Sequence, residues 1–228
     1  LLDEIDFENV GFALNMPQDS LFVRTMLPKT TLKDGVIDLK EASYYVKSFE
    51  MDNAELAYGP KEELSLKKIG LQLDSIYYCG RDIRANIEEF VFKERSGLEL
   101  VSTEGRIASD SVLIQIPKFT MKTTASSLDL QTKIGWDVLE MKKTGVLSAK
   151  INAEIGKGDV AKILGGRDTL FLQTYPNKPF VFRADAEGDL KRLRLRTLEA
   201  GLAKAFELKA EGDLLHLTDS LRRGGEIK

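Results

Sequence analysis

The sequence is poor in the side chains that most enzymes and metal sites depend on. Its 228 residues include one histidine, one cysteine and one tryptophan. A single cysteine excludes an internal disulfide, and one cysteine with one histidine excludes the common zinc sites. His216 alternates with Leu215 and Leu217, as a strand-surface residue would, and no neighbouring motif pairs it as a catalytic base. We therefore expect no enzyme activity and neither a metal nor a cofactor.

Long apolar runs and a strong charge excess are also missing. No stretch approaches the ~20 apolar residues of a membrane helix, and no signal peptide is present. The formal net charge of −3 predicts no nucleic-acid partner. We expect the chain, which opens directly at Leu1, to be a segment of a longer protein, so its missing targeting signal says little about location.

Two short motifs allow a chemical interpretation but favour a structural one. Cys79 stands in Tyr77-Tyr78-Cys79-Gly80, where a small packing residue at a strand end is expected rather than a nucleophile. Gly156-Lys157-Gly158 lacks the Gly-Lys-Ser/Thr ending of a phosphate-binding loop, and predicts a tight strand-to-helix turn. An oxygen-only calcium site or a carboxylate pair stays an alternative, without an Asp-x-Asp-x-Asp run to support it.

The dominant pattern is a period-two alternation of apolar and polar residues. It predicts strands with one apolar and one wet face, because successive side chains of a strand point to opposite sides. The two cleanest runs cover residues 128–138 and 147–155. Their apolar-phase positions are Leu128, Leu130, Thr132, Ile134, Trp136 and Val138 in the first run, and Leu147, Ala149, Ile151, Ala153 and Ile155 in the second.

Turn signals such as Asp34-Gly35 and Thr144-Gly145 separate these runs. Their spacing is typical of antiparallel strands joined by tight turns, and predicts about 12–16 strands in total. The apolar phase flips between Ile87 and Phe90, where we expect a bulge or a short turn.

Helical signals are few. One short helix is predicted near residues 159–164, with Asp159 capping its first turn and glycines ending it. Leu198 to Phe206 fits either a second short helix or a loop that enters a strand. The pentapeptide of residues 186–190 recurs at 210–214, which indicates a quasi-repetitive sheet.

The apolar faces fit two arrangements. In a closed β-sandwich, two such faces meet in a dry core. In an open, curved sheet, the inner face stays available to apolar ligands. The sequence has no long amphipathic helix to cover a large one-faced sheet, which favours the open form, although a second sheet from the same chain would also cover it.

Three stretches carry a resemblance to a known family. Residues 88–100, 104–107 and 122–130 together resemble large AsmA-like proteins of the TamB type, especially those of Bacteroidota envelopes. The strand–glycine–strand punctuation at residues 152–156 and 210–214 is similar as well. The resemblance covers most of the chain, and its motifs include no catalytic signature.

This resemblance implies a fold, a location and a role. Such proteins form an elongated, curved, antiparallel-rich sheet whose apolar lining makes a groove, the β-taco. It implies that residues 1–228 are one β-groove segment, with a sub-boundary near residues 165–168. Family members are anchored in the inner membrane by an N-terminal helix, extend across the periplasm, and are implicated in moving phospholipids toward the outer membrane. An outer-membrane barrel of the Omp85 type is the partner that the family implies, through regions outside this segment.

From the alternations themselves, we expect phospholipid acyl chains to lie against a set of apolar side chains. These are Ile114, Ile116, Ile134, Trp136, Val138, Leu147, Ile151 and Ile155. The alternative is a closed β-sandwich that serves as an interaction module in outer-membrane protein assembly. A hydrolase or sugar-binding domain is disfavoured by the single tryptophan and the 8% aromatic content.

Overall fold

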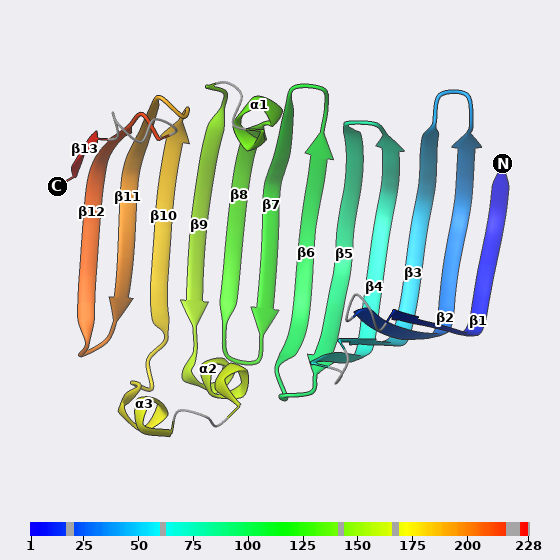
Figure 1. Cartoon of the computed structure of the whole chain (residues 1–228), viewed down its shortest axis with the longest axis horizontal. Helices are drawn as coiled ribbons and strands as arrows, with labels where there is room; N and C mark the ends of the chain where they lie inside the picture. Colours follow the sequence, from blue (N-terminus) through cyan, green and yellow to red (C-terminus); the bar gives the residue numbers. More distant parts are fainter. Residues whose placement is uncertain (17–20, 60–62, 141–143, 166–168, 218–223, 228) are drawn as a thin grey trace. The chain divides into compact units, whose positions relative to one another are not determined.

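The computed structural model describes residues 1–16, 21–59, 63–140, 144–165, 169–217 and 224–227. In this part of the chain, thirteen strands form one sheet, ordered β1 to β13 as in the sequence and not closed into a barrel (Figure 1). The expected all-β fold with an open antiparallel sheet is therefore confirmed, and so is the expected number of strands. The sub-boundary expected near residues 165–168 falls mostly on residues 166–168, which lie outside the described part.

Most strands are long, and the helices are short. The first six strands are β1 (Leu2–Met16), β2 (Leu21–Asp38), β3 (Ser43–Tyr58), β4 (Leu64–Cys79), β5 (Asp82–Glu94) and β6 (Glu99–Ser109). The others are β7 (Leu113–Thr123), β8 (Ser127–Gly135), β9 (Leu147–Ile155), β10 (Phe180–Gly188), β11 (Arg192–Leu202), β12 (Phe206–Leu215) and β13 (Gly224–Ile227). The helices are α1 (Trp136–Leu139), α2 (Lys157–Leu164) and α3 (Thr169–Thr174).

The chain divides into two compact units. The first consists of Leu1–Glu104 with Met121–Thr124, and the second of Gly105–Thr120 with Ala125–Lys228. The undecided stretch from Leu198 to Phe206 belongs to the second unit, where it forms the end of β11, a turn and the start of β12 rather than a helix.

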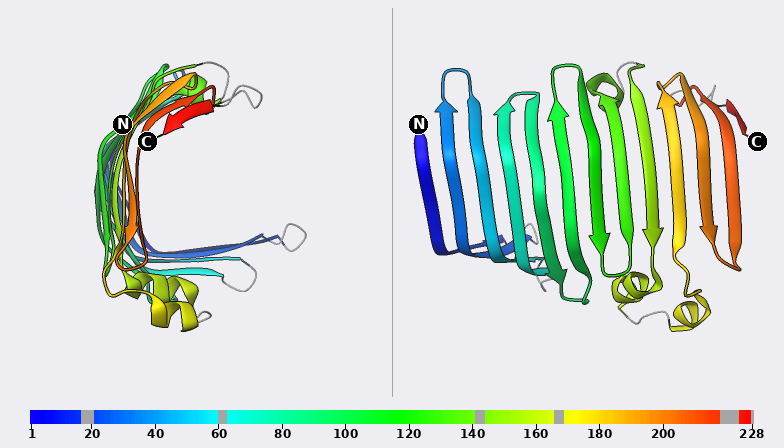
Figure 2. Two further views of the ribbon diagram at one scale, coloured as in Figure 1. Left: turned by 90° about the vertical axis from the view of Figure 1, so that its left-hand side faces the viewer. Right: turned by 180° about the vertical axis from the view of Figure 1, so that it is seen from behind.

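In the first unit, β1 to β4 bend sharply along their length (Figure 2). Irregular residues lie side by side on neighbouring strands. Asn9 of β1 lies opposite Pro28 of β2, because the residues on either side of Asn9 pair with Lys29 and Leu27. Asn53 of β3 directly follows Asp52, which pairs with Lys29. Asn9 and Asn53 both have positive φ, 54° and 53°. The β3–β4 register also shifts next to Asn53. The β1–β2 and β2–β3 registers gain no residue there, so among these three pairings only the β3–β4 pair has a bulge at this point. Bulges bend and twist strands, and the positive φ of Asn9 and Asn53 adds local irregularity to strands that stay in register.

The bulge expected between Ile87 and Phe90 is confirmed. Leu73 of β4 pairs with Ile87 and Gln72 pairs with Glu89, so Glu88 is an extra residue on β5. The flip of the apolar phase in the sequence therefore marks a real irregularity of the ladder.

The two copies of the pentapeptide repeat share a backbone feature. Gly188 of β10 has a φ of 146° and Gly212 of β12 a φ of 153°, values that L side chains rarely adopt. A Cβ at Gly188 would lie 2.1 Å from the Arg192 carbonyl oxygen. The repeat therefore encodes a local strand conformation that requires glycine.

Helix α2 is fixed to the turn between β7 and β8 by a buried carboxylate. Asp159 is 2% exposed, and the Ser126 hydroxyl donates to its Oδ2 over 2.6 Å. The backbone N–H of Gly156 donates to the same Ser126 oxygen over 3.1 Å. The helix prediction is confirmed, and Gly165 ends it in the left-handed conformation, but the predicted cap is wrong: Gly156 is the N-cap, and no side chain caps this end.

The described residues contain very few buried apolar side chains. They are Ala54, Ala57, Ile69, Leu100, Val138 and Tyr175. A sandwich packs the inner faces of two sheets into a shared core, whereas the described chain supplies one sheet only. The second layer of a closed sandwich is therefore not provided by these residues.

We predict that Gly156→Ala destabilises the protein, whereas Gly158→Ala does not. A Cβ at Gly156 would lie 2.2 Å from the Ala125 carbonyl oxygen, but one at Gly158 would lie 3.4 Å from the Ala125 Cβ, an ordinary contact. Overpacking of this kind costs about 1–3 kcal/mol, while alanine in place of glycine inside a helix gains up to about 1 kcal/mol. Denaturant unfolding measures both, and equal stability of the two variants would contradict the proposed contact.

Candidate functional site

The most distinctive surface of the second unit is an apolar face that spans five strands. Directly opposed residues in an antiparallel pair lie on the same face, so the registers define its members. Those of β8 and β9 are Leu128, Leu130, Thr132 and Ile134, then Leu147, Ala149, Ile151, Ala153 and Ile155. Those of β10 to β12 are Phe180, Phe182, Ala184, Ala186 and Gly188; Leu193, Leu195, Leu198, Ala200 and Leu202; and Phe206, Leu208, Ala210, Gly212 and Leu214. We call this set the apolar face.

The apolar face carries no charged residue, and Thr132 is its one polar side chain. None of its members is buried: each is half-buried or exposed, with Phe206 at 52% and Leu208 at 50%. Five strands at about 4.8 Å spacing and nine residues at about 3.3 Å rise give about 700 Å². Exposed apolar patches on monomers seldom exceed about 300–600 Å² and often mark binding sites. The face therefore has the size and composition of a surface that binds an apolar partner.

The opposite face of the same strands is polar and is crossed by ion pairs. Arg183 of β10 lies 3.1 Å from Glu199 of β11, and also donates to the Asn152 side-chain oxygen of β9 over 3.3 Å. Arg192 lies 2.7 Å from Asp213 of β12. Arg192 thus belongs to a wet strand face, as its alternating spacing with Arg194 indicates. This face is compatible with water, which leaves the apolar face as the one that needs a cover.

The first unit repeats this division between faces. One row of opposed residues across β1 to β5 is apolar, and the next row along the strands lies on the other face and is polar. The apolar row is Ile5, Leu32, Phe49, Leu73 and Ile87, and the polar row is Asp6, Thr31, Glu50, Gln72 and Glu89. No member of this apolar row is buried.

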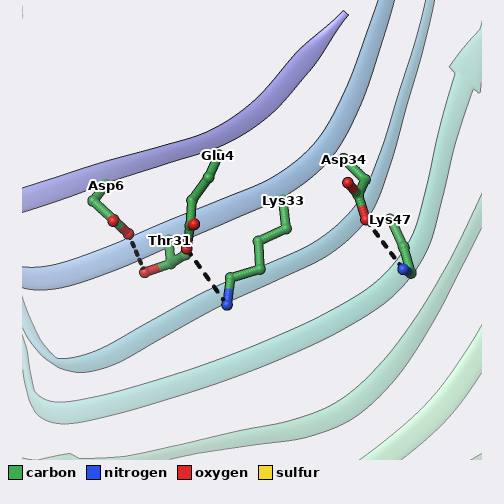
Figure 3. Close-up of polar contacts among 6 residues, drawn as sticks. All are labelled: Glu4, Asp6, Thr31, Lys33, Asp34 and Lys47. Carbon is green, nitrogen blue, oxygen red and sulfur yellow. Dashed lines mark hydrogen bonds and ion pairs between the residues drawn. The ribbon is translucent and has the colours of Figure 1, made fainter.

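Side-chain contacts reinforce the strand pairs of the first unit (Figure 3). The Thr31 hydroxyl of β2 donates to Asp6 Oδ1 of β1 over 2.6 Å, and Lys33 Nζ lies 3.5 Å from Glu4 Oε1. Lys47 of β3 lies 3.1 Å from Asp34 of β2, and this hydrogen bond raises the pKa of the lysine. These contacts join adjacent strands without involving the apolar row.

Four of the expected lining residues lie together on the apolar face. They are Ile134, Leu147, Ile151 and Ile155; Ile134 and Leu147 are directly opposed. Ile114 and Ile116 are half-buried and share one face of β7. The backbone N–H of Trp136 donates to the Val112 carbonyl over 3.0 Å. Counting two residues inward from this bond on each strand places Ile114 opposite Ile134.

Trp136 and Val138 are not on a strand, so the strand expected through residue 138 is wrong. β8 ends at Gly135, and both residues belong to α1. The Trp136 indole N–H donates to the Asp110 carbonyl over 2.7 Å. Val138 is 7% exposed, and a Cβ at Gly145 would lie 2.8 Å from its Cγ2. The two side chains therefore contact the turns at the end of the sheet, and they do not extend the apolar face.

Most of the apolar face on β10 to β12 escaped the sequence interpretation. The alternation is unbroken along β10 and β12 but is interrupted on β11: the β10–β11 register shifts after Asp185, and the β11–β12 register shifts between Leu195 and Leu198. The apolar residues of β11 therefore follow a two–three–two spacing. An alternation search that allows one inserted residue would recover them.

The other candidate residues lie apart from the apolar face or outside strands. Cys79 ends β4, where its sulfur lies 3.6 Å from the Glu41 carbonyl oxygen. His216 follows β12, is exposed, and has a φ of 53°. In the described ranges, no three His, Cys, Asp or Glu side chains are grouped as a metal site would require. None of the described helices has the length and apolar character to cross a bilayer.

No protein-family model, no curated protein and no solved structure matches this chain. The fold and the described residues define its class: an all-β protein built on one open antiparallel sheet, with an apolar face whose side chains are half-buried or exposed and a polar, ion-paired face.

We predict that Arg192→Gln raises the pKa of Asp213. The hydrogen bond from Arg192 is the main cause that holds this pKa below its ordinary value. Because the folded-state pKa is depressed, the pair stabilises the fold above the ordinary aspartate pKa, and this is lost as the pH falls through the depressed value. Carboxyl ¹³C NMR titration measures the change. An unchanged pKa of Asp213 in the variant would contradict the pairing.

Proposed function

We propose that this chain is a segment of a periplasm-spanning, AsmA-like protein that conducts phospholipids between the inner and outer membranes and so supports outer-membrane biogenesis. The observation that carries this proposal is the uncovered apolar face of β8 to β12. In this proposal the chain has no catalytic role. The anchor in the inner membrane and the contact with an Omp85-type outer-membrane barrel belong to parts of the protein outside this segment.

The physical argument is the cost of exposing acyl chains to water. Each CH₂ group moved from an apolar surface into water costs about 0.8 kcal/mol. A sixteen-carbon chain therefore loses roughly 10 kcal/mol unless an apolar surface stays in contact with it along the way. A face without charges over five strands supplies such a surface, while the headgroup stays in solvent.

The uniformity of the face favours movement over retention. A tight small-molecule site needs a concave pocket with a few convergent polar groups that fix the ligand. The apolar face offers Thr132 as its one polar side chain, and otherwise leucine, isoleucine, phenylalanine, alanine and glycine. An acyl chain on it gains similar contacts at many positions, which suits a conduit.

The sandwich alternative requires a second sheet, which the described residues do not supply. Its role as an interaction module would also need a partner to cover the apolar face. Lipid extraction and native mass spectrometry of the purified protein distinguish the two functions, because a protein partner and a phospholipid differ in mass and in solubility in organic solvent.

We predict that Ile151→Asp removes co-purifying phospholipid and that Asn152→Asp does not. Ile151 lies between Leu130 and Ala184 on the apolar face, whereas the next residue along β9 points to the polar face beside Arg183. A carboxylate pressed against acyl chains loses its hydration without a partner, at a cost of several kcal/mol. Lipid extraction and native mass spectrometry measure the lipid-to-protein ratio, which should fall at least about fivefold in Ile151→Asp alone.

Circular dichroism and thermal unfolding serve as the controls, and both variants should remain folded because Ile151 is half-buried on an open face. A wild-type protein that purifies without lipid would overturn the proposal. So would an Ile151→Asp protein that unfolds outright, since that residue would then belong to a closed core.

A further inference from the structure

The first unit contains a hollow lined by basic side chains, where the start of β4 pairs with the end of β5. The hollow has a volume of about 470 Å³. Its cationic side chains are Lys67, Lys68, Lys93 and Arg95, and its acidic ones are Glu55 and Glu94. All of them belong to the first unit. The whole chain has a formal net charge of −3, so the hollow is a local positive site on an acidic protein.

The strand register brings two of these cations directly together. Lys67 of β4 is opposed to Lys93 of β5. The same register continues two residues further, where the Arg95 N–H donates to the Ser65 carbonyl over 3.0 Å. Ser65 projects to the same side as Lys67, because alternate residues of a strand share a face. Directly opposed residues have Cβ atoms about 4.5–5.5 Å apart, so the ends of both lysines can reach one small anion.

A bulge adds a further cation to the hollow. The β4–β5 register shifts between Lys67 and Gly70, and β4 gains one residue there. Lys68 lies in this bulge with a φ of 53°. Bulges re-aim side chains and are frequent beside functional sites, and a positive φ in a residue other than glycine is uncommon. The irregular backbone therefore places Lys68 beside the opposed lysine pair.

No acid neutralises these cations within the part of the chain that the structure describes. None of the four basic side chains forms an ion pair or a side-chain hydrogen bond with another described residue. Glu94 accepts a hydrogen bond from the Ser96 N–H over 2.6 Å and attracts Arg95 without forming an ion pair. Like charges that are directly opposed destabilise a strand pair. A bound anion would remove this repulsion.

Ser65 supplies a hydroxyl group in the wall of the hollow. The residue is only 8% exposed, and it lines the hollow together with the basic side chains. Its hydroxyl has no hydrogen-bond partner among the described residues. Buried polar side chains are nearly always hydrogen-bonded, and a serine hydroxyl can donate to an oxygen of an anion. The hydroxyl is therefore a second, independent indication of a ligand in this hollow.

We propose that the hollow binds a phosphate group. A phosphate monoester carries a charge of about −1.5 to −2 at neutral pH and has three strong acceptor oxygens. Arginine binds phosphate through parallel N–H bonds, and lysine binds it as a point charge. A carboxylate has one charge and two oxygens, so it would leave more of the cations and the hydroxyl without a partner. This site goes beyond the proposed function and does not depend on it, because its argument uses only charges of the first unit.

The test is a titration of the whole chain with inorganic phosphate at constant ionic strength, followed by ³¹P NMR. The wild type should bind phosphate. Lys93→Gln should weaken the binding about tenfold, since it removes one charge-assisted hydrogen bond. Ser65→Ala should weaken it about fivefold without a change of charge. The matched control is Lys40→Gln, which removes an exposed lysine from the β2–β3 turn and should bind phosphate as the wild type does.

A second titration identifies the source of the phosphate group. Its probe is dihexanoyl phosphatidic acid below its micelle concentration. Tighter binding of this lipid than of inorganic phosphate assigns the site to a lipid headgroup, and equal or weaker binding assigns it to a soluble phosphate compound. Both results support the site.

Three results would overturn the inference. They are a wild type that does not bind phosphate, equal losses of affinity in Lys93→Gln and Lys40→Gln, and unchanged affinity in Ser65→Ala. The last two would reduce the binding to a general attraction between an anion and surface charge. Circular dichroism checks the fold of each variant, and Lys93→Gln should stay folded because it removes a repulsion between exposed side chains.

Discussion

The fold depends on main-chain hydrogen bonding between neighbouring strands. A single-layer sheet has almost no core, and the buried apolar side chains of the described residues are few. The strands compensate through length: β1 and β2 stay in register from Leu2–Gly35 to Met16–Leu21. Antiparallel pairing in chain order allows short turns, so most strands are added to the previous one at little cost in loop entropy. The connection from β9 to β10 is longer and contains α2 and α3.

The two faces of this single-layer sheet have different roles. Ion pairs and hydrogen bonds lie on the polar face of the second unit, where exposed pairs contribute little to stability because water screens them. They keep that face soluble and help to set the register. The apolar face contributes little to the described fold because nothing there covers it. The free energy of burying its apolar side chains is therefore available to a ligand, and in the proposed function that ligand is an acyl chain.

The ends of the strands are where the regular pattern stops. Trp136 and Val138 fold into α1 because Trp136 bonds to the Asp110 carbonyl and Val138 fills a space beside Gly145. At the other end of the second unit, Gly156 allows the chain to pass against the Ala125 carbonyl, and Asp159 binds Ser126. Both sets of contacts fix short helices to neighbouring turns of the sheet without adding a second layer.

The sequence predicted the strands best where the alternation is unbroken. The run from Leu128 to Ile134 and that from Leu147 to Ile155 are strands as expected, because period-two spacing has one structural meaning when it persists. The strand prediction failed at Trp136 and Val138. These two residues continue the period-two spacing, but their tertiary contacts stabilise a short helical turn instead of a strand. It missed the apolar face of β11, where a bulge shifts the apolar phase between Leu195 and Leu198. The contact of Asp159 with Ser126 joins residues far apart in the sequence, so no local sequence pattern predicts it.

The most direct test of an apolar face that accepts acyl chains is methyl NMR with a spin-labelled fatty acid. The account predicts that the methyl signals of Ile134, Ile151 and Ile155 broaden as the fatty acid is added, while that of Val181, on the polar face of β10, stays sharp. Equal broadening on both faces, or none on the isoleucines, would contradict it.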